Sequence, residues 1–434
     1  MFRFRDPIHG FIEATESERK IIDSSPFQRL RNIKQLGTSY LVYHGAEHTR
    51  FGHSLGVMHL VTKMFDTIIS KQPTLFDEPT TARYRQILRL IGLTHDLGHA
   101  PFSHASEELF EKGFDHEDMT RELLLHTEIA DYICEIGKLF SDKYGEAYNI
   151  TPELIWLIYE GKDVFNDKYL MPDFKFLKSF MDGEIDCDKM DYLLRDSYYC
   201  GVQYGHYDID RLISSFNVYQ EKDENLLFIA LEHGGIHALE EFVLARYFMF
   251  IQVYYHKTRR YLDKKLVDCL KRILPNQKYP SDVTEYLSWD DNKVLELIQQ
   301  RKKADPFAEE FANREVLTCI YQAPVHTDKN GSRLFKTYCR DIEEKILEQG
   351  INRANLPRYY YNDEIEKLAH KIPEGIHERE GKGIVIPILV KHQKEPSSVY
   401  DESLLLRSLK DPITIKRIYV HEKFKQLAES VINV

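Results

Sequence analysis

Apolar residues recur at helical spacing through most of this chain, from Asp23 to about Lys271. Side chains three and four positions apart share one face of an α-helix, so such a stripe predicts a helix that packs into a core. Two clear stripes are His53, Val57, Leu60 and Met64, and Tyr84, Leu88, Ile91 and His95. Gly113 ends one predicted helix, over 105–112, and Asp115 begins the next. The pattern predicts a mainly α protein.

Both ends of the chain depart from this pattern. Residues 1–14 alternate around Gly10, which predicts a short hairpin. Beyond about residue 275 the pattern is mixed, with a predicted helical segment over 281–304, strands over 383–393 and 412–421, and a closing helix over 422–434. We therefore expect two parts. The first, 1–275, joins the hairpin to a helical domain, and the second, 276–434, is a smaller α+β region for regulation or oligomerisation.

Composition excludes several classes of protein. Hydrophobic residues make up 43% and charged residues 29% of the chain, as in ordinary globular proteins. The net charge of −11 argues against a protein that mainly coats nucleic acid. Six cysteines without a C-x-x-C pair fit free thiols in a reducing compartment. The N-terminus lacks the apolar core of a signal peptide, and the longest apolar run, 383–390, is too short to span a bilayer. We expect a cytoplasmic protein with no membrane partner.

One helical stretch, "LIGLTHDLGHAPFSHASEELF", carries three histidines and an aspartate where apolar residues are expected. A buried polar group without a partner is costly, so these residues need an explanation. Two imidazoles and two carboxylates form a mixed nitrogen and oxygen set that suits a divalent metal ion and leaves room for water or substrate. The candidate ligands are His53, His95, Asp96 and Asp188, all within predicted helical segments.

A His-Asp pair alone is weak evidence, because the chain has 19 histidines and a single histidine on an apolar face is usually a core residue. The density of polar groups from His95 to His104, beside the helix break at Pro101, is what favours a site. The donor set accepts Fe, Mn, Zn or Ni, with Mg²⁺ accompanying nucleotide phosphates. The extra histidines leave a second ion open as an alternative.

Three segments, "HTRFGHSLGVMHL", "THDLGHAPFSH" and "EIDCDKMDYLLRD", resemble the signature motifs of HD-domain phosphohydrolases. More narrowly, they resemble the deoxynucleoside triphosphate triphosphohydrolase branch. The similarity runs in order from "FRDPIHGFIE" through "FQRLRNIKQLGTSYLVYHGAEHTRFGHS" to "YYHK" near residue 257. It implies a helical HD-domain core and hydrolysis of a deoxynucleoside triphosphate (dNTP) to deoxynucleoside and intact triphosphate.

The resemblance also implies roles for particular residues. His53, His95, Asp96 and Asp188 match the family's metal ligands one for one. His99, His104 and His116 match histidines near the scissile phosphate. Glu107 would orient the catalytic histidine. The animal relative has an aspartate at this position, so the Glu107 side chain is longer by one methylene. By spacing alone, His116 is better explained as an N-terminal helix residue.

Candidate substrate groups fall on helix faces. Asp188, Tyr192 and Asp196 are four residues apart, with Lys189 adjacent, and Arg246, Phe250 and Tyr254 repeat the spacing. The resemblance implies that Arg50, Lys189 and Arg246 hold the triphosphate. It further implies that Gln35, Tyr192, Asp196 and Tyr254 contact the sugar, and Leu36 is a further candidate substrate-binding residue. Spacing alone would make the tyrosines core aromatics and the charges a solvated face. Phe250 replaces a histidine of the animal enzyme, which leaves base preference open.

A second nucleotide site is also implied by the resemblance. Asp23, Gln28 and Arg31 match an Asp–Gln–Arg set that binds an activating GTP or dNTP between subunits, and a homotetramer or dimer would follow. Phe2 and Arg5 replace a lysine and an asparagine of the relative, so phosphate contacts there differ. The alternative is a helix start with surface charges.

Two other functions remain as alternatives. A phosphodiesterase or nucleotidase of the same superfamily would use the same metal set and release different products. A non-catalytic nucleotide sensor would keep the fold, and weak nucleic-acid binding stays open, although the acidic charge disfavours it.

Overall fold

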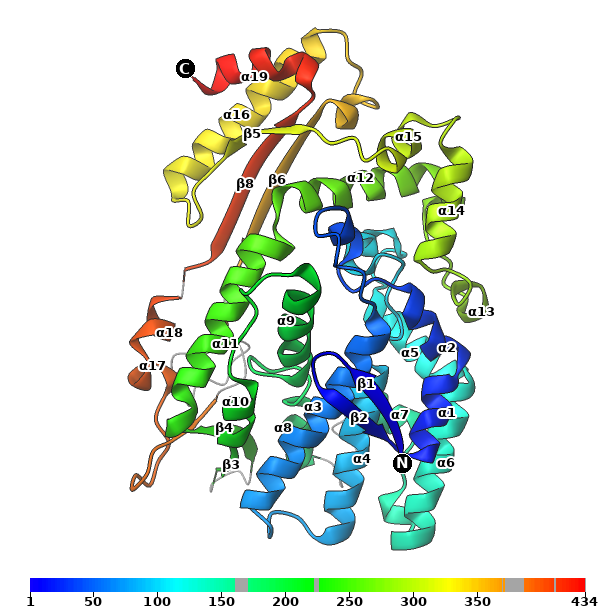
Figure 1. Ribbon diagram of the computed structural model, residues 1–434, viewed down its shortest axis with the longest axis vertical. Coiled ribbons are helices and arrows are strands. Elements are labelled where there is room, and N and C mark those ends of the chain that lie inside the picture. The colour runs from blue at the N-terminus through cyan, green and yellow to red at the C-terminus, as the bar shows by residue number, and fades with distance from the viewer. Residues whose placement is uncertain (161–170, 222–225, 369, 371–385, 410, 434) are drawn as a thin grey trace.

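A computed structural model of the chain describes residues 1–160, 171–221, 226–368, 370, 386–409 and 411–433. Helices dominate, which confirms the predicted mainly α class, and three small sheets complete the fold. Figure 1 shows a helical body at one end of the long axis and a helix-backed sheet near the C-terminus at the other. No helix among the described residues is long and apolar enough to cross a membrane.

The predicted N-terminal hairpin is present. β1 (Phe2–Asp6) pairs antiparallel with β2 (Gly10–Ala14), and Gly10 adopts a φ of 75°, which a glycine tolerates without strain. The Asp6 carboxylate accepts the backbone N–H groups of Ile8 and His9, each at 2.9 Å, and so closes the turn. The hairpin leads into α1 (Glu16–Asp23), which starts with a capping box, and α2 (Ser25–Arg29).

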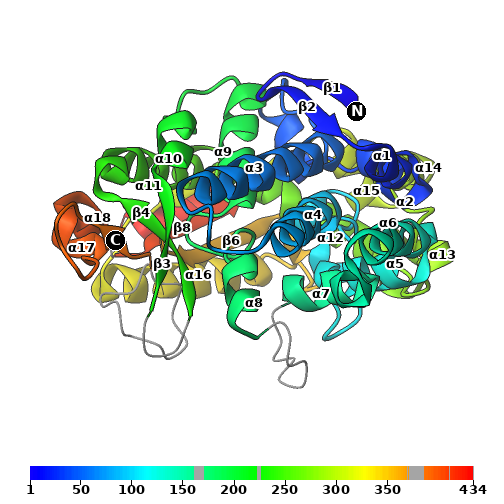
Figure 2. The same cartoon turned by 90° about the horizontal axis from the view of Figure 1, so that it is seen from below.

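The centre of the body is α3 (Arg50–Lys71), which contacts both α4 (Glu78–Thr94) and α9 (Cys187–Cys200). A Cβ at Gly92 would lie 3.1 Å from Met58 Cα, so glycine lets the backbones of α3 and α4 approach closely. Figure 2 shows α3 and α4 side by side. The three helices that carry the candidate metal ligands therefore pack against one another through α3.

The remaining elements of the body surround this centre. They are α5 (His116–His126), α6 (Glu128–Tyr144), α7 (Pro152–Glu160), α8 (Met171–Lys178), α10 (Ile209–Ser215), β3 (Phe216–Gln220), β4 (Leu227–Glu232), α11 (Ile236–Met249) and α12 (Lys257–Ile273). A π turn, Phe250–Tyr254, joins α11 to α12, and Tyr255 N–H donates to Phe250 O at 2.8 Å, five residues back. This turn interrupts the α-helical spacing next to the candidate site.

The prediction of a helix over 105–112 is wrong. The chain forms two 3₁₀ turns there, Ser103–Ala105 and Glu107–Leu109. Phe102 and Ser103 both have left-handed φ values, 61° and 54°, and Phe102 N–H donates to Asp291 Oδ1 at 2.7 Å. A contact with a residue far along the chain thus holds the loop in a non-helical path. Asp115 caps α5 as predicted.

Later elements divide between two cores. α13 (Val283–Tyr286), α14 (Asp291–Arg301) and α15 (Pro306–Ala312) share the core of the body. A sheet of order β5-β8-β6 packs against α16 and α19 around a separate core that includes Phe335, Ile342 and Ile418. Its elements are β5 (Thr318–Gln322), α16 (Lys329–Glu348), β6 (Tyr360–Lys367), β8 (Ile413–Val420) and α19 (Lys425–Ile432). The two-part division at residue 275 stays a prediction.

The strand predicted over 383–393 differs from what is observed. Residues 383–385 lie outside the described residues, and β7 is only Ile388–Leu389. β7 pairs parallel with β4 of the helical body, with Leu231 opposite Ile388. α17 (Val399–Glu402) and α18 (Leu404–Ser408) follow it and lead to β8, which confirms the strand predicted over 412–421.

Candidate active site

Side chains from three helices converge at the predicted metal centre. His53 lies in the first turn of α3, His95 and Asp96 follow the end of α4, and Asp188 lies in the first turn of α9. Ligand atoms of His53, His95 and Asp188 all lie within 4.8 Å of one another. Asp96 completes the cluster, with its oxygens 3.5 Å from His53 Nε2 and 3.4 Å from His95 Nε2. The structure therefore brings together the four residues that the sequence proposes.

The cluster fits a divalent cation chemically. Among the described residues, the buried Nε2 atoms of His53 and His95 both lie among the carboxylate oxygens of the centre, His53 Nε2 2.9 Å from Asp188 Oδ1, but neither makes a well-directed hydrogen bond. His95 Nδ1 lies 3.0 Å from Gly92 O, so Nε2 faces the centre. Burial lowers the pKa of His53, but the carboxylates of Asp188 and Asp191 at its two nitrogens raise it to about 10. Such a set of inward-facing nitrogen and carboxylate donors is compensated by a positive ion.

Arg50 binds one of these carboxylates. Its Nη1 donates to Asp96 Oδ2 at 2.7 Å, and its Nε donates to Ser103 Oγ at 3.0 Å. Burial raises the pKa of Asp96, but the Arg50 guanidinium and nearby imidazoles hold it well below its usual range. Asp96 is therefore a carboxylate, and Arg50 is fixed at the edge of the metal centre.

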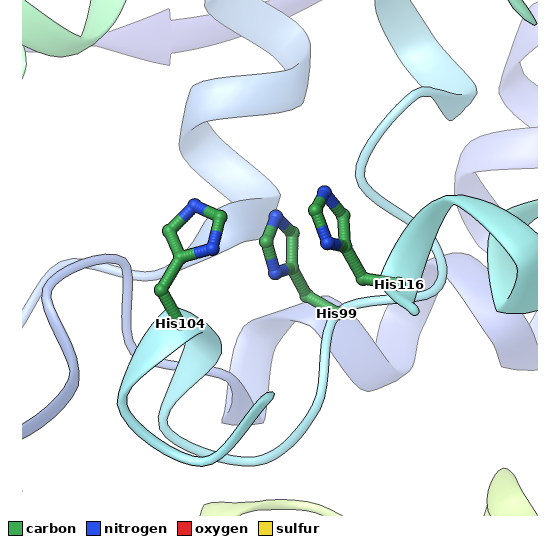
Figure 3. A group of neighbouring side chains, drawn as sticks. All are labelled: His99, His104 and His116. Carbon is green, nitrogen blue, oxygen red and sulfur yellow. The ribbon is translucent and has the colours of Figure 1, made fainter. Parts of the chain in front are cut away.

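His99, His104 and His116 form a second cluster, shown in Figure 3. The rings of His99 and His116 stack with centroids 4.2 Å apart and an interplanar angle of 13°, and His104 meets both edge-on. Their nitrogens also lie within 4.8 Å of one another, which satisfies distance for a metal. However, ring lone pairs lie in the ring plane, so the near-parallel rings of His99 and His116 do not direct their lone pairs at one ion. This arrangement fits proton transfer better than a second metal.

Glu107 joins two of these histidines. One carboxylate oxygen hydrogen-bonds to His116 Nδ1, and the other lies 2.8 Å from His104 Nδ1. Burial lowers the pKa of His116, but Glu107 more than offsets this and raises it overall. Burial and Arg50 hold the pKa of His99 well below its usual range. His116 therefore holds a proton more readily than the neutral ring stacked on it.

A cavity of about 790 Å³ connects the two clusters. Predicted residues that line it are Gln35, Leu36, Arg50, His95, Asp96, His99, His104, His116, Asp188, Lys189, Tyr192, Asp196 and Tyr254. Among the predicted metal, catalytic and substrate residues, His53, Glu107 and Arg246 do not line it. His53 instead contacts Asp188, and Glu107 contacts His116, and both of these partners line the cavity.

Arg246 lies behind the wall of the cavity. Its Nη1 is 3.3 Å from Glu184 Oε2, and its guanidinium lies over the ring of Phe250 at 5.5 Å. Phe250 and Tyr254 do line the cavity. The π turn changes the spacing between Phe250 and Tyr254, because a π turn does not keep 3.6 residues per turn, but it begins after Arg246. A triphosphate role for Arg246 stays a prediction.

The end of the cavity predicted to hold the sugar is built around a buried carboxylate. Asp196 Oδ1 accepts from His48 Nε2 at 2.8 Å, and Asp196 Oδ2 accepts from the Tyr254 hydroxyl at 2.8 Å. Tyr192 meets Tyr254 edge-on at 6.0 Å. His48 was missed by the sequence analysis, although it stands two residues before Arg50 in a matched motif. The site also includes residues that no motif indicated: Tyr159, Lys178, Arg259, Arg260, Lys264, Tyr361 and Lys367.

The predicted second nucleotide site lies elsewhere, with Asp23 at the end of α1, Gln28 in α2 and Arg31 in the 3₁₀ turn Leu30–Asn32 that follows. Arg31 Nε donates to Gln28 Oε1 at 2.8 Å, and its guanidinium lies 3.5 Å from the centre of the Phe51 ring. Asp23 instead accepts from Arg19 at 3.0 Å. Gln28 and Arg31 are thus in contact with each other, and activation through these three residues stays a prediction.

Known proteins share these features. Residues 50–158 match the HD domain, and residues 207–355 match the HD associated region. The chain is 36% identical to uncharacterized protein YwfO of Bacillus subtilis over 62% of this chain and 55% of that protein. It is 31% identical to the deoxynucleoside triphosphate triphosphohydrolase SAMHD1 homolog of Dictyostelium discoideum over 82% of this chain and 67% of that protein. The chain spans about half the length of the first curated relatives that it matches.

A solved structure extends the likeness to the whole chain. The crystal structure of a hypothetical protein from Aquifex aeolicus is 32% identical, has a TM-score of 0.76 and covers 99% of each chain. Together with the converging histidines and aspartates, these similarities identify the family. The chain belongs to the HD-domain phosphohydrolase family, in the deoxynucleoside triphosphate triphosphohydrolase-like group that combines an HD domain with an HD-associated region.

Proposed function

We propose that the protein hydrolyses dNTPs to deoxynucleoside and triphosphate with a divalent ion held by His53, His95, Asp96 and Asp188. The observation that carries this proposal is one cavity of about 790 Å³ lined by metal-centre residues, histidines, basic groups and tyrosines. Its volume is in the range of pockets that enclose a small-molecule ligand. The similarity to a triphosphohydrolase of Dictyostelium supports the choice of substrate class.

In this reaction, water attacks the α-phosphorus, the bond from phosphorus to the 5′ oxygen breaks, and triphosphate leaves the nucleoside. The chemistry that a divalent ion supplies when bound at the centre is polarisation of a phosphoryl oxygen and activation of water. Arg50 and Lys189 stabilise charge on the triphosphate, with Arg246 behind them. Lys189 Nζ is held in position by Gly183 O at 2.9 Å and by the Asp186 carboxylate.

His116 is the proposed general acid. Glu107 holds its Nδ1 side, so that Nε2 is available to the substrate, and favours the protonated ring. His116 donates a proton to the departing 5′ oxygen, which such groups accelerate by about 10²- to 10⁴-fold. His104 is the other imidazole bound to Glu107, and its side chain is 58% exposed. His99 lies between the acid and the metal centre, 3.2 Å from Asp96.

Product analysis tests the reaction. The purified protein is incubated with Mn²⁺ and each of the four dNTPs, singly and mixed, and the products are separated by ion-exchange chromatography. We expect triphosphate and deoxynucleoside, and no turnover by the Asp188→Ala variant. Monophosphate or inorganic phosphate would instead assign a phosphodiesterase or nucleotidase, and no turnover with Mn²⁺, Fe²⁺, Zn²⁺ or Ni²⁺ would favour a nucleotide sensor.

Activation is a separate part of the proposal. We propose that GTP or a second dNTP binds at Asp23, Gln28 and Arg31 and promotes a homo-oligomer. The support is the exposed Arg31, whose guanidinium stacks on the buried Phe51 ring and offers charge and a planar face to a nucleotide. We expect the turnover rate with the dNTP mixture to exceed the sum of the rates with the single dNTPs. This excess should be lost in Arg31→Ala. Unchanged rates and an unchanged sedimentation coefficient on adding GTP would contradict it.

A further inference from the structure

A buried carboxylate lies behind the metal centre, on the opposite side of His53 from Asp188. Asp191 Oδ2 is 2.8 Å from His53 Nδ1, and Asp188 Oδ1 is 2.9 Å from His53 Nε2. The side chains of His53 and Asp191 are both 0% exposed. With its Nδ1 proton donated to Asp191, His53 would hold a metal ion through Nε2 once the ion replaces the proton there. This is the arrangement by which a second carboxylate fixes the tautomer and direction of a metal-binding histidine.

Asp191 is itself held on both of its oxygens. Arg195, one turn along α9, donates from Nε to Oδ2 at 2.8 Å and from Nη2 to Oδ1 at 2.9 Å. His9 Nε2 donates to Oδ1 at 2.6 Å. A Cβ on Gly56 would lie 1.9 Å from Asp191 Oδ1, so α3 leaves no room for this carboxylate to move. The position of Asp191 is therefore determined from three sides.

The N-terminal hairpin supplies part of this support. His9 lies in the turn between β1 and β2, more than 180 residues before Asp191 in the chain. The same turn is closed by Asp6, whose Oδ2 accepts from Arg195 Nη1 at 2.8 Å. The hairpin thus contacts both Asp191 and the arginine that holds it. A continuous set of buried hydrogen bonds runs from the hairpin turn to a metal ligand.

We infer that Asp191 is a positioning residue for His53, and that Asp6 and His9 of the hairpin hold Asp191 in place, so that metal affinity depends on the N-terminal hairpin. This inference rests on the metal centre of the proposed function. No hairpin residue lines the cavity, and the hydrogen bonds of Asp6 and His9 in this network go to Arg195 and Asp191 rather than to a metal ligand. Its effect on the metal therefore passes through Asp191.

The test compares Asp191→Asn with a matched control, Glu18→Gln. Glu18 is also 0% exposed and is also bound by an arginine through two bonds, Arg89 Nε at 2.6 Å and Arg89 Nη2 at 2.7 Å. Both variants lose a buried arginine–carboxylate pair, but only Asp191 contacts a metal ligand. Metal-depleted protein is titrated with Mn²⁺, and free Mn²⁺ is measured by electron paramagnetic resonance. Denaturation in urea is measured in parallel.

We expect the Mn²⁺ dissociation constant of Asp191→Asn to rise about 10- to 100-fold, as for other partners of metal-binding histidines. Glu18→Gln should lose stability and keep the wild-type dissociation constant. His9→Gln retains the carboxylate and its arginine, so a smaller rise of roughly two- to tenfold is expected, in line with one hydrogen bond. His9→Gln also provides the test if Asp191→Asn does not fold.

An unchanged dissociation constant in the folded variants would overturn the inference, as would an equal loss in Glu18→Gln. These outcomes are independent of the substrate. If Asp191→Asn binds Mn²⁺ normally while the wild type releases triphosphate from dNTPs, the positioning role fails and the proposed function stands. If Mn²⁺ binding weakens as expected while the wild type releases monophosphate, the positioning role stands and the proposed function fails.

Discussion

Glu107 binds two imidazoles with its two carboxylate oxygens, and this position gives it control over the charge of His116. In Glu107→Gln the negative charge that raises the pKa of His116 is lost, so this pKa falls. A general acid works in its protonated form. The alkaline limb of the kcat profile should therefore move to lower pH, with kcat about 10²-fold lower above the new pKa. Steady-state rates from pH 5 to 10 measure both effects.

The control for this prediction is Glu111→Gln, an exposed neighbour in the same loop, which should leave the profile in place. An alkaline limb that does not move in Glu107→Gln would exclude His116 as the titrating acid. Loss of rate without a shift would mean that Glu107 only orients the ring.

For individual residues, the sequence allowed the metal ligands to be predicted, but it did not allow the contacts between distant residues to be predicted. The four metal-centre residues were identifiable because polar groups stood in helix faces that must be buried. His48 and Asp191 were not, because each acts by contacting a residue far away in the chain, Asp196 and His53. Spacing within a helix carries no information about such partners.

Among the helices and strands, the packing position of α5 depends on Gly98. A Cβ on this residue would lie 2.2 Å from His116 O and from Thr120 N, both backbone atoms. Gly98→Ala must therefore push α5 away, and His116 begins this helix. We expect the free energy of unfolding to fall by about 2–3 kcal/mol, as for other overpacked sites, and kcat to fall with it. Urea denaturation and steady-state kinetics measure these two quantities.

Gly331→Ala serves as the comparison. Its Cβ would meet the side chain of Thr327 at 2.6 Å, and a side chain can rotate where a backbone cannot. We expect a change of less than about 1 kcal/mol in this helix variant. A Gly98→Ala protein as stable as wild type would show that α5 shifts freely.

Elements with a long, regular pattern were predictable, and those fixed by distant contacts were not. α3 and α4 follow from the apolar stripes in their sequences. The loop over 102–109 contains residues that favour a helix, but Asp291 binds its backbone in another conformation. The strand predicted over 383–393 was placed in the 276–434 part without a partner, and the short β7 found there pairs with β4 of the body. Strand partners are a property of the folded chain, so local periodicity cannot specify them.

At the scale of the molecule, the metal centre joins three helices from different parts of the chain. An ion bound only by the folded state stabilises it, by about 2.7 kcal/mol when its concentration is 100 times the dissociation constant. Adding Mn²⁺ to metal-depleted protein should therefore raise Tm by roughly 3–5 °C. Differential scanning fluorimetry measures this shift. In Asp188→Ala it should disappear, and an equal shift in that variant would place the ion elsewhere.

The C-terminal sheet also reaches the candidate site. Tyr361 of β6 lines the cavity and stacks on Tyr419 of β8 with centroids 5.5 Å apart. Tyr361→Ala should raise KM for dNTPs roughly three- to tenfold by removing an aromatic wall, with little change in kcat. Kinetics with each dNTP measure this split. The Mn²⁺ dissociation constant is the internal control, because Tyr361 is not among the metal-centre residues.

The π turn at Phe250–Tyr254 has a consequence for how such a pocket diversifies over generations. A π turn is equivalent to one extra residue inserted into an α-helix. Losing a single codon there would rotate the side chains after the deletion by about 100° relative to Arg246. One deletion would thus change which of these side chains face the pocket, with the metal centre on other helices left untouched.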